Sequence, residues 1–438
     1  MNYDVRSQTV ILVAICAAFA GRVQAQDYEQ PPISYSTAVP ANKVSDLVDK
    51  IRNGTAGLTH EAGFGYLQSV LRELEIPASS QVLVFSKTSL QRHRISPRKP
   101  RAIYFSDNVY VGFCQAGDVL EVSAVDPNLG AVFYTIDQRS QETPQFLRQT
   151  ENCLLCHSSA RTEGVPGHVV RSLLVDKTGN PILSAGSYVV DHTTPLAQRW
   201  GGWYVTGKHG DQTHLGNLIA TEGDAPRQVA NEQSLNVMQL SDCIAVGDYL
   251  TPHSDIVALM VLEHQIMVQN RLARASYATR QALHYQAELN RSLGEPVGHA
   301  LESTRRRIES AGDDLVEALL MVGEARITAQ IAGTSSFAGD FAKAGPRDSR
   351  GRSLRDLDLQ RRLLRYPCSY LIYSAAFDAL PIEMRNYVWQ RLWNVLIAEH
   401  DADEFAHLTG PDRQAIVEII RETKPVLPDY WKATDTSR

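Results

Sequence analysis

Cysteine and methionine are scarce in this chain of 438 residues, which has six of each. Cys114, Cys243 and Cys368 stand far from one another, so the sequence lacks both the dense cysteine framework of a small disulfide-rich domain and the second thiol pair of a typical zinc site. In an oxidising compartment, three such cysteines allow one disulfide and one free thiol. The sequence does not say which two would pair.

Basic charge and long apolar runs are also missing. The formal net charge is −6, which argues against nucleic acid as a partner because binding to phosphates needs a basic surface. After residue 26 no apolar stretch approaches the roughly 20 residues that span a bilayer, so no transmembrane segment is expected in the mature chain. With 43% hydrophobic residues and no internal repeat, the composition is typical of a globular protein large enough for two or three domains of ~100–200 residues each.

The first 25 residues have the features of a secretory signal peptide. Arg6 precedes an apolar segment from Val10 to Ala20, and Ala25 is a small residue of the kind that signal peptidase prefers. We therefore predict cleavage after Ala25 and a periplasmic location; a retained membrane anchor is the alternative. Residues 26–43 are rich in Gln, Pro, Ser and Asn, and we expect them to form a flexible arm.

The spacing of apolar residues predicts an α+β protein. Between residues 45 and 75 they recur at helical spacing, which predicts two helices. A hairpin is expected at 168–184, and after residue 250 the helical spacing returns. We therefore expect a mixed α/β region over 44–250 and a helical domain over 251–438. Short runs of β-branched and aromatic residues predict strands at 81–85, 102–105, 109–113, 119–123 and 131–135, and the later helical segments lie at 256–266, 315–327 and 388–396.

One short run, Glu151-Asn-Cys-Leu-Leu-Cys-His157, carries the chemistry. Its two cysteines and the histidine directly after the second form a C-x-x-C-H pattern, in which the thiols add across the vinyl groups of haem and the imidazole binds the iron. The alternatives are a disulfide between Cys153 and Cys156 or a zinc ion bound by the same thiols. The pattern predicts one covalent haem c, attached through Cys153 and Cys156, with His157 as the proximal ligand of the iron.

Residues 150–168 resemble the c-type cytochrome superfamily, and the whole chain resembles larger exported bacterial proteins that carry one haem motif. In small cytochromes c a Gly-Pro loop after the motif directs a carbonyl at the proximal histidine, and residues 164–167 (Gly-Val-Pro-Gly) stand at the matching place here. The resemblance implies that a carbonyl of this loop fixes the tautomer of His157. A strand pattern follows where small cytochromes c have helices. We therefore expect a β-rich haem-bearing N-terminal half rather than the plain small cytochrome c fold.

The ligand on the other side of the iron is less clear from the sequence. The first methionine after His157 is Met238, so the nearby Met of ordinary cytochromes c is missing. Residues 200–214 concentrate Trp, Tyr, Gly and His, and aromatic planes and glycines suit close packing on a porphyrin. We name His214, and after it His209, as distal candidates; the alternative is that both lie in a surface turn beside a buried strand. We expect His168 to stay on the proximal side.

Two other polar features have ordinary alternatives. Glu263 and His264 pair a carboxylate with an imidazole, but neighbours on a helix point about 100° apart, so we interpret them as ordinary helix residues. The basic run from Arg347 to Arg352 has the guanidinium groups to bind a haem propionate or an anionic partner, and a solvated surface is the alternative.

These features together predict a periplasmic mono-haem c-type cytochrome protein that takes part in redox chemistry. Electron transfer with a periplasmic redox partner needs only what the motif supplies. One alternative is a haem enzyme, peroxidase-like or acting on another small oxidisable molecule. The other is a haem-based gas sensor. The oligomeric state does not follow from the sequence.

Overall fold

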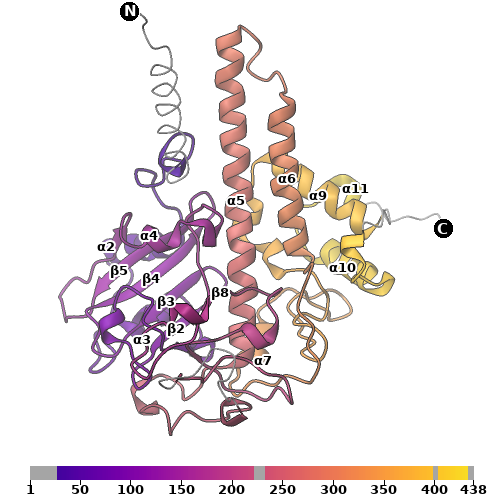
Figure 1. Cartoon of the computed structure of the whole chain (residues 1–438). Helices are drawn as coiled ribbons and strands as arrows, with labels where there is room; N and C mark the ends of the chain where they lie inside the picture. Colours follow the sequence, from indigo (N-terminus) through magenta and orange to yellow (C-terminus); the bar gives the residue numbers. More distant parts are fainter. Residues whose placement is uncertain (1–26, 221–231, 398–402, 433–438) are drawn as a thin grey trace, which may run out of the picture.

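The computed structural model describes residues 27–220, 232–397 and 403–432. The expected α+β architecture is confirmed: an antiparallel seven-stranded sheet occupies the N-terminal half and the C-terminal half is mostly helical (Figure 1). The signal peptide predicted over residues 1–25 lies outside the described residues. None of the helices in the described ranges has both the length and the apolar character needed to cross a membrane.

The large sheet has the strand order β6-β5-β4-β3-β2-β1-β9. All five predicted strands are present, and the tight turn between β4 and β5 forms because Asp126 Oδ1 accepts the backbone N–H groups of Asn128 and Leu129 at 2.9 and 3.1 Å. Gly130 follows with a φ of 67°, a conformation that favours glycine. The strands are β1 (Val82–Val84), β2 (Arg101–Phe105), β3 (Val109–Phe113), β4 (Val119–Asp126), β5 (Gly130–Asp137), β6 (Leu147–Gln149) and β9 (Trp203–Tyr204).

Alternation along the strands directs side chains into two cores. In β1, Val82 and Val84 pack with the central helix of the molecule, whereas Leu83 packs with the two helices at the other face of the sheet. Those helices are the predicted pair, α2 (Lys43–Arg52) and α3 (Leu67–Glu73). The sheet is therefore covered on both faces.

The segment before α2 is packed against the sheet, which contradicts the expected flexible arm. Tyr28, Ile33 and Tyr35 are buried, and the Tyr35 hydroxyl donates to the carbonyl of Ala131 on β5 at 2.7 Å. The guanidinium of Arg148 donates to the carbonyl of Tyr35 at 2.6 Å. Polar composition suggested an arm, but three large apolar side chains are enough to hold this segment.

The hairpin expected at 168–184 is present in a different form. Strand β7 (Arg171–Ser172) pairs with β8 (Tyr188–Val189), and only a single bridge joins Val175 to Pro181. The return strand was expected at 182–184, but residues 183 and 184 belong to a 3-10 turn (Leu183–Ala185) instead. The return strand therefore lies a few residues later than predicted.

Helix α5 (Ile256–Leu293) is the axis of the molecule, with the sheet on one side and helices α9 to α11 on the other (Figure 1). Asp255 caps its start by accepting the N–H groups of Val257 and Ala258, and Gly294 ends it with a φ of 72°. Most of its residues up to Ala275 are buried, because the helix passes between the sheet and the helical half. Its polar residues must therefore find partners inside the protein.

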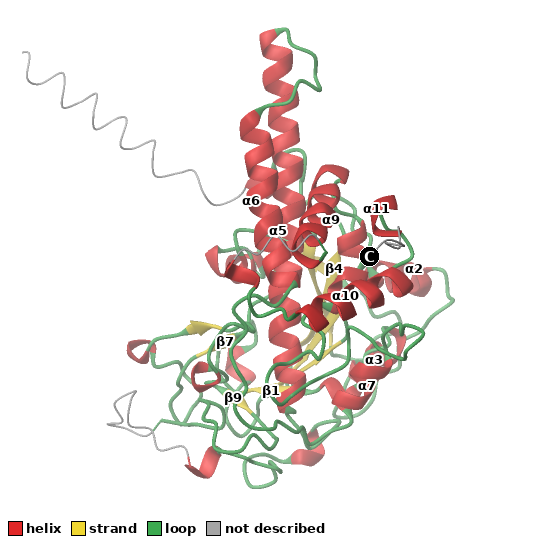
Figure 2. Ribbon diagram, turned by 90° about the vertical axis from the view of Figure 1, so that its right-hand side faces the viewer, coloured by secondary structure: helices red, strands yellow, loops and turns green. Residues whose placement is uncertain are grey.

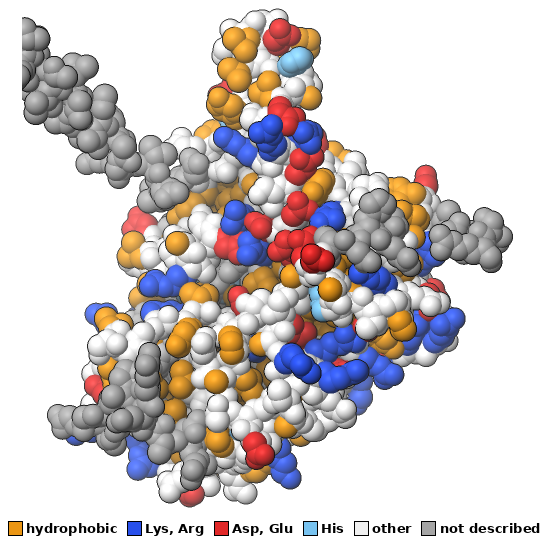
Figure 3. Space-filling model, turned by 45° about the vertical axis from the view of Figure 1, so that its right-hand side comes forward, with side chains coloured by type: hydrophobic (Ala, Val, Ile, Leu, Met, Phe, Trp, Pro, Cys, Tyr) orange, Lys and Arg blue, Asp and Glu red, His pale blue; other side chains and the backbone are white. Residues whose placement is uncertain are grey.

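Helix α6 (Glu302–Leu319) runs back along α5, and the two form a hairpin that projects from the body (Figures 1 and 2). Acidic and basic side chains lie next to each other down this hairpin (Figure 3), as in the pairs that Arg305 forms with Glu302 and Glu309. Ile327, expected to continue this helical segment, lies in the loop after α6. The remaining helices are α7 (Phe337–Lys343), α8 (Ala375–Asp378), α9 (Ile382–Leu396), α10 (Gly410–Thr423) and α11 (Asp429–Lys432).

Candidate functional site

The C-x-x-C-H run forms a single helical turn, α4 (Leu154–His157), with Cys153 directly before it. The His157 N–H donates to the Cys153 carbonyl at 3.0 Å, which closes the turn and brings the two thiols to the same side as the imidazole. All five described cysteines are free thiols. The disulfide considered between Cys153 and Cys156 is therefore not formed, and neither is the pair considered among the other three cysteines.

His157 is oriented by the loop that follows the motif. Its Nδ1 lies 3.0 Å from the carbonyl oxygen of Gly167. A carbonyl only accepts, so Nδ1 carries the proton and Nε2 of the neutral ring carries the lone pair. Burial lowers the pKa of His157, and the hydrogen bond to Gly167 opposes this effect. The ring thus has the tautomer that an iron ligand needs, with the carbonyl supplied by the loop that the sequence pointed to.

The loop itself is fixed from three sides. The carbonyl of Pro166 accepts the N–H of Ala131 on β5 at 2.9 Å, and the N–H of Gly167 donates to the carbonyl of His157 at 2.8 Å. Asn270 on α5 accepts the N–H of His168 at 3.1 Å and donates to its carbonyl at 2.8 Å. A Cβ on Gly167 would lie 2.9 Å from Cγ of Asn270, so any other residue there would displace Asn270 or the loop.

Aromatic rings surround the imidazole of His157. The ring of Phe133 on β5 lies 4.8 Å away and that of His168 lies 6.3 Å away, between centroids. His168 is buried, its Nε2 is 2.7 Å from the Ser123 hydroxyl, and burial lowers its pKa to about 3. At neutral pH His168 is therefore an uncharged neighbour of His157, and its place on the proximal side of a haem stays a prediction.

Charged groups lie next to the two thiols. The ion pair of Arg101 and Glu121 crosses the sheet beside Cys153, and it passes over Gly112, where any side chain would collide with Arg101. Burial raises the pKa of the Cys153 thiol to about 11, and Glu121 adds to this rise. Near Cys156, the guanidinium of Arg171 has a buried Nε with no hydrogen-bond partner in the described structure. An unsatisfied guanidinium N–H of this kind needs an acceptor.

Apolar side chains on α4 and around β8 face solvent. Leu155 on α4 is 80% exposed, and Tyr188 and Val189 on β8, the strand paired with Arg171, are more than one-third exposed. Leu183, in the loop between β7 and β8, is 74% exposed. Leu155, on the same turn as Cys156, is the kind of exposed apolar surface that a large planar apolar cofactor would cover.

The two distal candidates, His209 and His214, lie together in another environment. Their rings are 4.7 Å apart, and that of His214 is 5.2 Å from Trp200. Each accepts a backbone N–H, His209 at Nε2 from Asn236 and His214 at Nδ1 from Gly216. Both are buried, which rules out the surface turn that we had considered for them. Their ring contacts share no residue with those of His157, and the distal assignment stays a prediction.

A second buried polar cluster was not predicted from the sequence. His192 donates from Nε2 to the carbonyl of Val322 at 3.4 Å, so its Nδ1 accepts from Nδ1 of His264, 3.0 Å away. Nε2 of His264 then accepts from the Ser369 hydroxyl at 2.8 Å. Beside them Glu263 pairs with Arg199 at 2.9 Å, and burial raises the Glu263 pKa to about 7 while Arg199 opposes the rise. Glu263 and His264 do point to different partners, as helix geometry requires.

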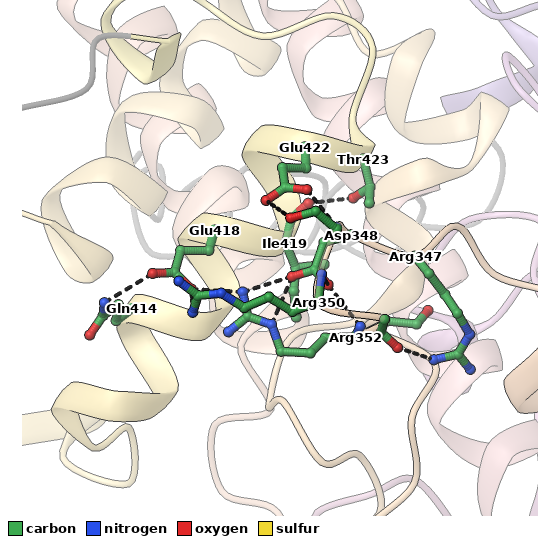
Figure 4. Close-up of polar contacts among 12 residues, drawn as sticks. Arg347, Asp348, Arg350, Arg352, Gln414, Glu418, Ile419, Glu422 and Thr423 are labelled. Atoms are coloured by element: carbon green, nitrogen blue, oxygen red, sulfur yellow. Dashed lines mark hydrogen bonds and ion pairs between the residues drawn. The ribbon is translucent and has the colours of Figure 1, made fainter.

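The basic run from Arg347 to Arg352 is neutralised within the protein. Figure 4 shows Arg350 and Arg352 turned toward Glu418 of α10, at 2.8 and 2.7 Å. Arg352 also pairs with Asp348, and Arg347 with Asp356 at 2.9 Å. These contacts anchor the loop to α10 and leave little positive charge for a propionate or an anionic partner.

The sequence did not reveal the residues around the motif that are distant from it along the chain. Phe133, Asn270 and Arg171 are separated from the motif by other elements, and no pattern in their neighbourhood points to it.

In the described ranges no group of three or more His, Cys, Asp or Glu side chains gathers as a metal site. Comparison with protein-family models, curated proteins and solved structures gave no match for this chain. Function has to be inferred from the residues themselves.

Proposed function

We propose that this chain is a periplasmic mono-haem c-type cytochrome protein that transfers single electrons. The observation that carries the proposal is the arrangement of His157, whose Nδ1–H is held by the Gly167 carbonyl while Nε2 stays available beside two free thiols on the same turn. A carbonyl behind the ligating imidazole fixes its tautomer and increases its basicity. Haem, when bound, supplies an iron that alternates between the ferric and ferrous states.

The residues around the motif fit this cofactor. Cys153 and Cys156 would form the two thioether bonds. Arg171 has an unsatisfied buried Nε near Cys156, and guanidinium groups bind carboxylates such as propionates well. Exposed Leu155, on the turn of the motif, would be covered by the porphyrin.

Electron transfer is favoured over catalysis by the position of the motif. Cys156 and Leu155 are exposed, so an attached haem would have an edge near the surface, where a periplasmic redox partner can approach. A haem enzyme and a gas sensor both need a protected open position at the iron, and no contact of the described residues favours one at His157. His214, or failing that His209, remains our candidate for the distal ligand.

The first test is covalent attachment. Wild-type protein exported with the haem-maturation system should retain haem after acidic acetone extraction, at one haem per chain by pyridine haemochrome. Cys153→Ser combined with Cys156→Ser should lose it, whereas Cys243→Ser, which alters a half-buried cysteine outside the motif, should keep it. Haem that stays covalently bound in the double variant refutes the assignment.

The second test separates the functions. For electron transfer we expect six-coordinate low-spin iron in both oxidation states, with a spectrum that carbon monoxide and peroxide do not change. High-spin iron that binds either one would favour the enzyme or the sensor. His214→Ala should convert the iron to high spin if His214 is the distal ligand, and an unchanged spectrum removes it as a candidate.

A further inference from the structure

The free end of the hairpin, residues 281–309, projects away from the sheet and, for most of its length, from helices α9 to α11 (Figures 1 and 2). The side chains buried between its two helices are mostly small or polar, and they include Ala282, Gln286, Asn290 and Thr304. Little apolar surface is therefore buried inside this part of the hairpin. Helices of this kind gain most of their stability when another surface packs on them.

The larger apolar side chains of the free end point outward instead. Tyr285 is 52% exposed, Leu293 is 66% exposed, and Leu289 between them is half-buried. These three residues are spaced four apart on α5, so they lie along one side of the helix, and we call them the apolar stripe. Val297, in the loop after α5, is 53% exposed. One exposed apolar residue needs no explanation, but a row of them indicates an interaction site.

Two charged side chains at the ends of the apolar stripe lack an ion-pair partner. The other charged side chains of the free end pair with one another, as Arg305 does with Glu302. Arg307 and Glu295 form no ion pair with any residue that the structure describes. The guanidinium of Arg307 lies 5.8 Å from the ring centroid of Tyr285, at one end of the stripe, and Glu295 follows directly after the other end. One positive and one negative charge are left over.

A second copy of the stripe complements both features. When two stripes pack antiparallel around Leu289, Tyr285 of each chain lies against Leu293 of the other. The same arrangement places Arg307 of each chain, at the Tyr285 end, beside Glu295 of the other. Because such a contact has two-fold symmetry, each pair forms twice. An anionic lipid surface would match Arg307 but repel Glu295, so it fits this charge pattern less well.

We propose that the apolar stripe is the interface of a homodimer of this chain, in which two hairpins pack antiparallel and Arg307 of each copy pairs with Glu295 of the other. The proposal does not depend on the proposed haem. Packing of the stripes removes apolar surface from water, and the two ion pairs fix the register. The interface is small, so we expect a dimer that dissociates on dilution.

Sedimentation equilibrium of the purified full-length protein tests the dimer. The average mass of wild type should rise with concentration toward that of two chains. Leu293→Asp places a charge in the interface from a position that is exposed in the single chain, so it should weaken association more than tenfold. Val426→Asp is the matched control, because Val426 is an exposed apolar residue outside the hairpin, 76% exposed. It should associate as wild type does.

The ion pairs have a test of their own. Arg307→Glu and Glu295→Arg should each weaken self-association about tenfold, because like charges then meet twice across the interface. When the two variants are mixed in equal amounts, association should return to within threefold of wild type, because each variant supplies the charge that the other needs. A role of either side chain within its own chain does not predict this recovery, which also shows that both variants are folded.

Three results would overturn the proposal. The first is a wild-type chain that stays monomeric throughout the concentration series; if that monomer binds phosphatidylglycerol vesicles, the stripe belongs to a lipid surface instead. The second is association that Leu293→Asp leaves undiminished, which places the interface elsewhere. The third is a mixture of Arg307→Glu and Glu295→Arg that associates no more strongly than the separate variants, which excludes the antiparallel pairing.

Discussion

Gly167→Ala tests the support of His157 most directly. The added methyl group would lie 2.9 Å from Cγ of Asn270, closer still to its Oδ1, and 3.2 Å from Cβ of Thr162. Either Asn270 moves and gives up its two hydrogen bonds to His168, or the loop moves and withdraws its carbonyl from His157. Overpacking of this kind costs about 1–3 kcal/mol. Loss of a hydrogen bond behind a metal ligand weakens metal affinity or activity roughly ten- to a hundredfold.

We expect Gly167→Ala to lower the urea midpoint. In protein that carries the proposed haem c, it should keep the covalent haem but loosen the bond between iron and His157, with high-spin bands in the ferric spectrum. Gly247→Ala is the control, because a Cβ there meets nothing within 4 Å and its backbone suits any residue. The double variant Gly167→Ala, Asn270→Ala removes the colliding amide, so its destabilisation should be smaller than the sum of the two single effects. A Gly167→Ala protein with wild-type midpoint and spectrum refutes the proposed support.

The buried polar cluster on α5 gives two further predictions. Glu263→Ala leaves the Arg199 guanidinium buried without its ion-pair partner, so it should lower the free energy of unfolding by about 3–5 kcal/mol in urea denaturation. Glu302→Ala, in an ion pair that solvent screens, should lower it much less, and equal losses in the two variants would contradict this expectation. Burial lowers the pKa values of His192 and His264 in the folded protein below 6.5. Below pH 6.5 the unfolded chain therefore binds more protons than the folded protein, and the free energy of unfolding falls as the pH drops. The fall is up to about 1.4 kcal/mol per pH unit for each histidine. Urea midpoints at pH 7 and pH 5 should show a smaller drop in His192→Asn than in wild type, and an equal drop would count against the pair.

The sequence was informative wherever a feature depends on near neighbours. The predicted strand at 119–123 is part of β4 because alternating side chains there suit a sheet with two covered faces. The carbonyl behind His157 comes from a loop only ten residues away, so spacing along the chain was enough to point to it. The same local logic separated Glu263 from His264 on their helix.

Predictions from near neighbours were wrong where a residue's partner lies far away along the chain. Residues 26–43 have the composition of an arm, yet Tyr35 finds a partner 96 residues away on β5. The strand that pairs with Arg171 begins later than expected because the pairing depends on the fold of the intervening loop. Ile327 fits a helical spacing but follows the end of α6.

The sequence by itself determined the α+β division and most of the elements, because side-chain periodicity acts over a few residues, and it located the motif on which the proposed function rests. Only the tertiary structure decided what surrounds the motif. Asn270 supports the loop from 102 residues away, and α5 carries it there because the helix is buried between the sheet and the helical half. The same packing fixes Tyr110 against His168, because the Tyr110 hydroxyl bonds to Gln265 and Gln269 of α5. Contacts of that kind depend on how whole elements pack, and no local pattern encodes them.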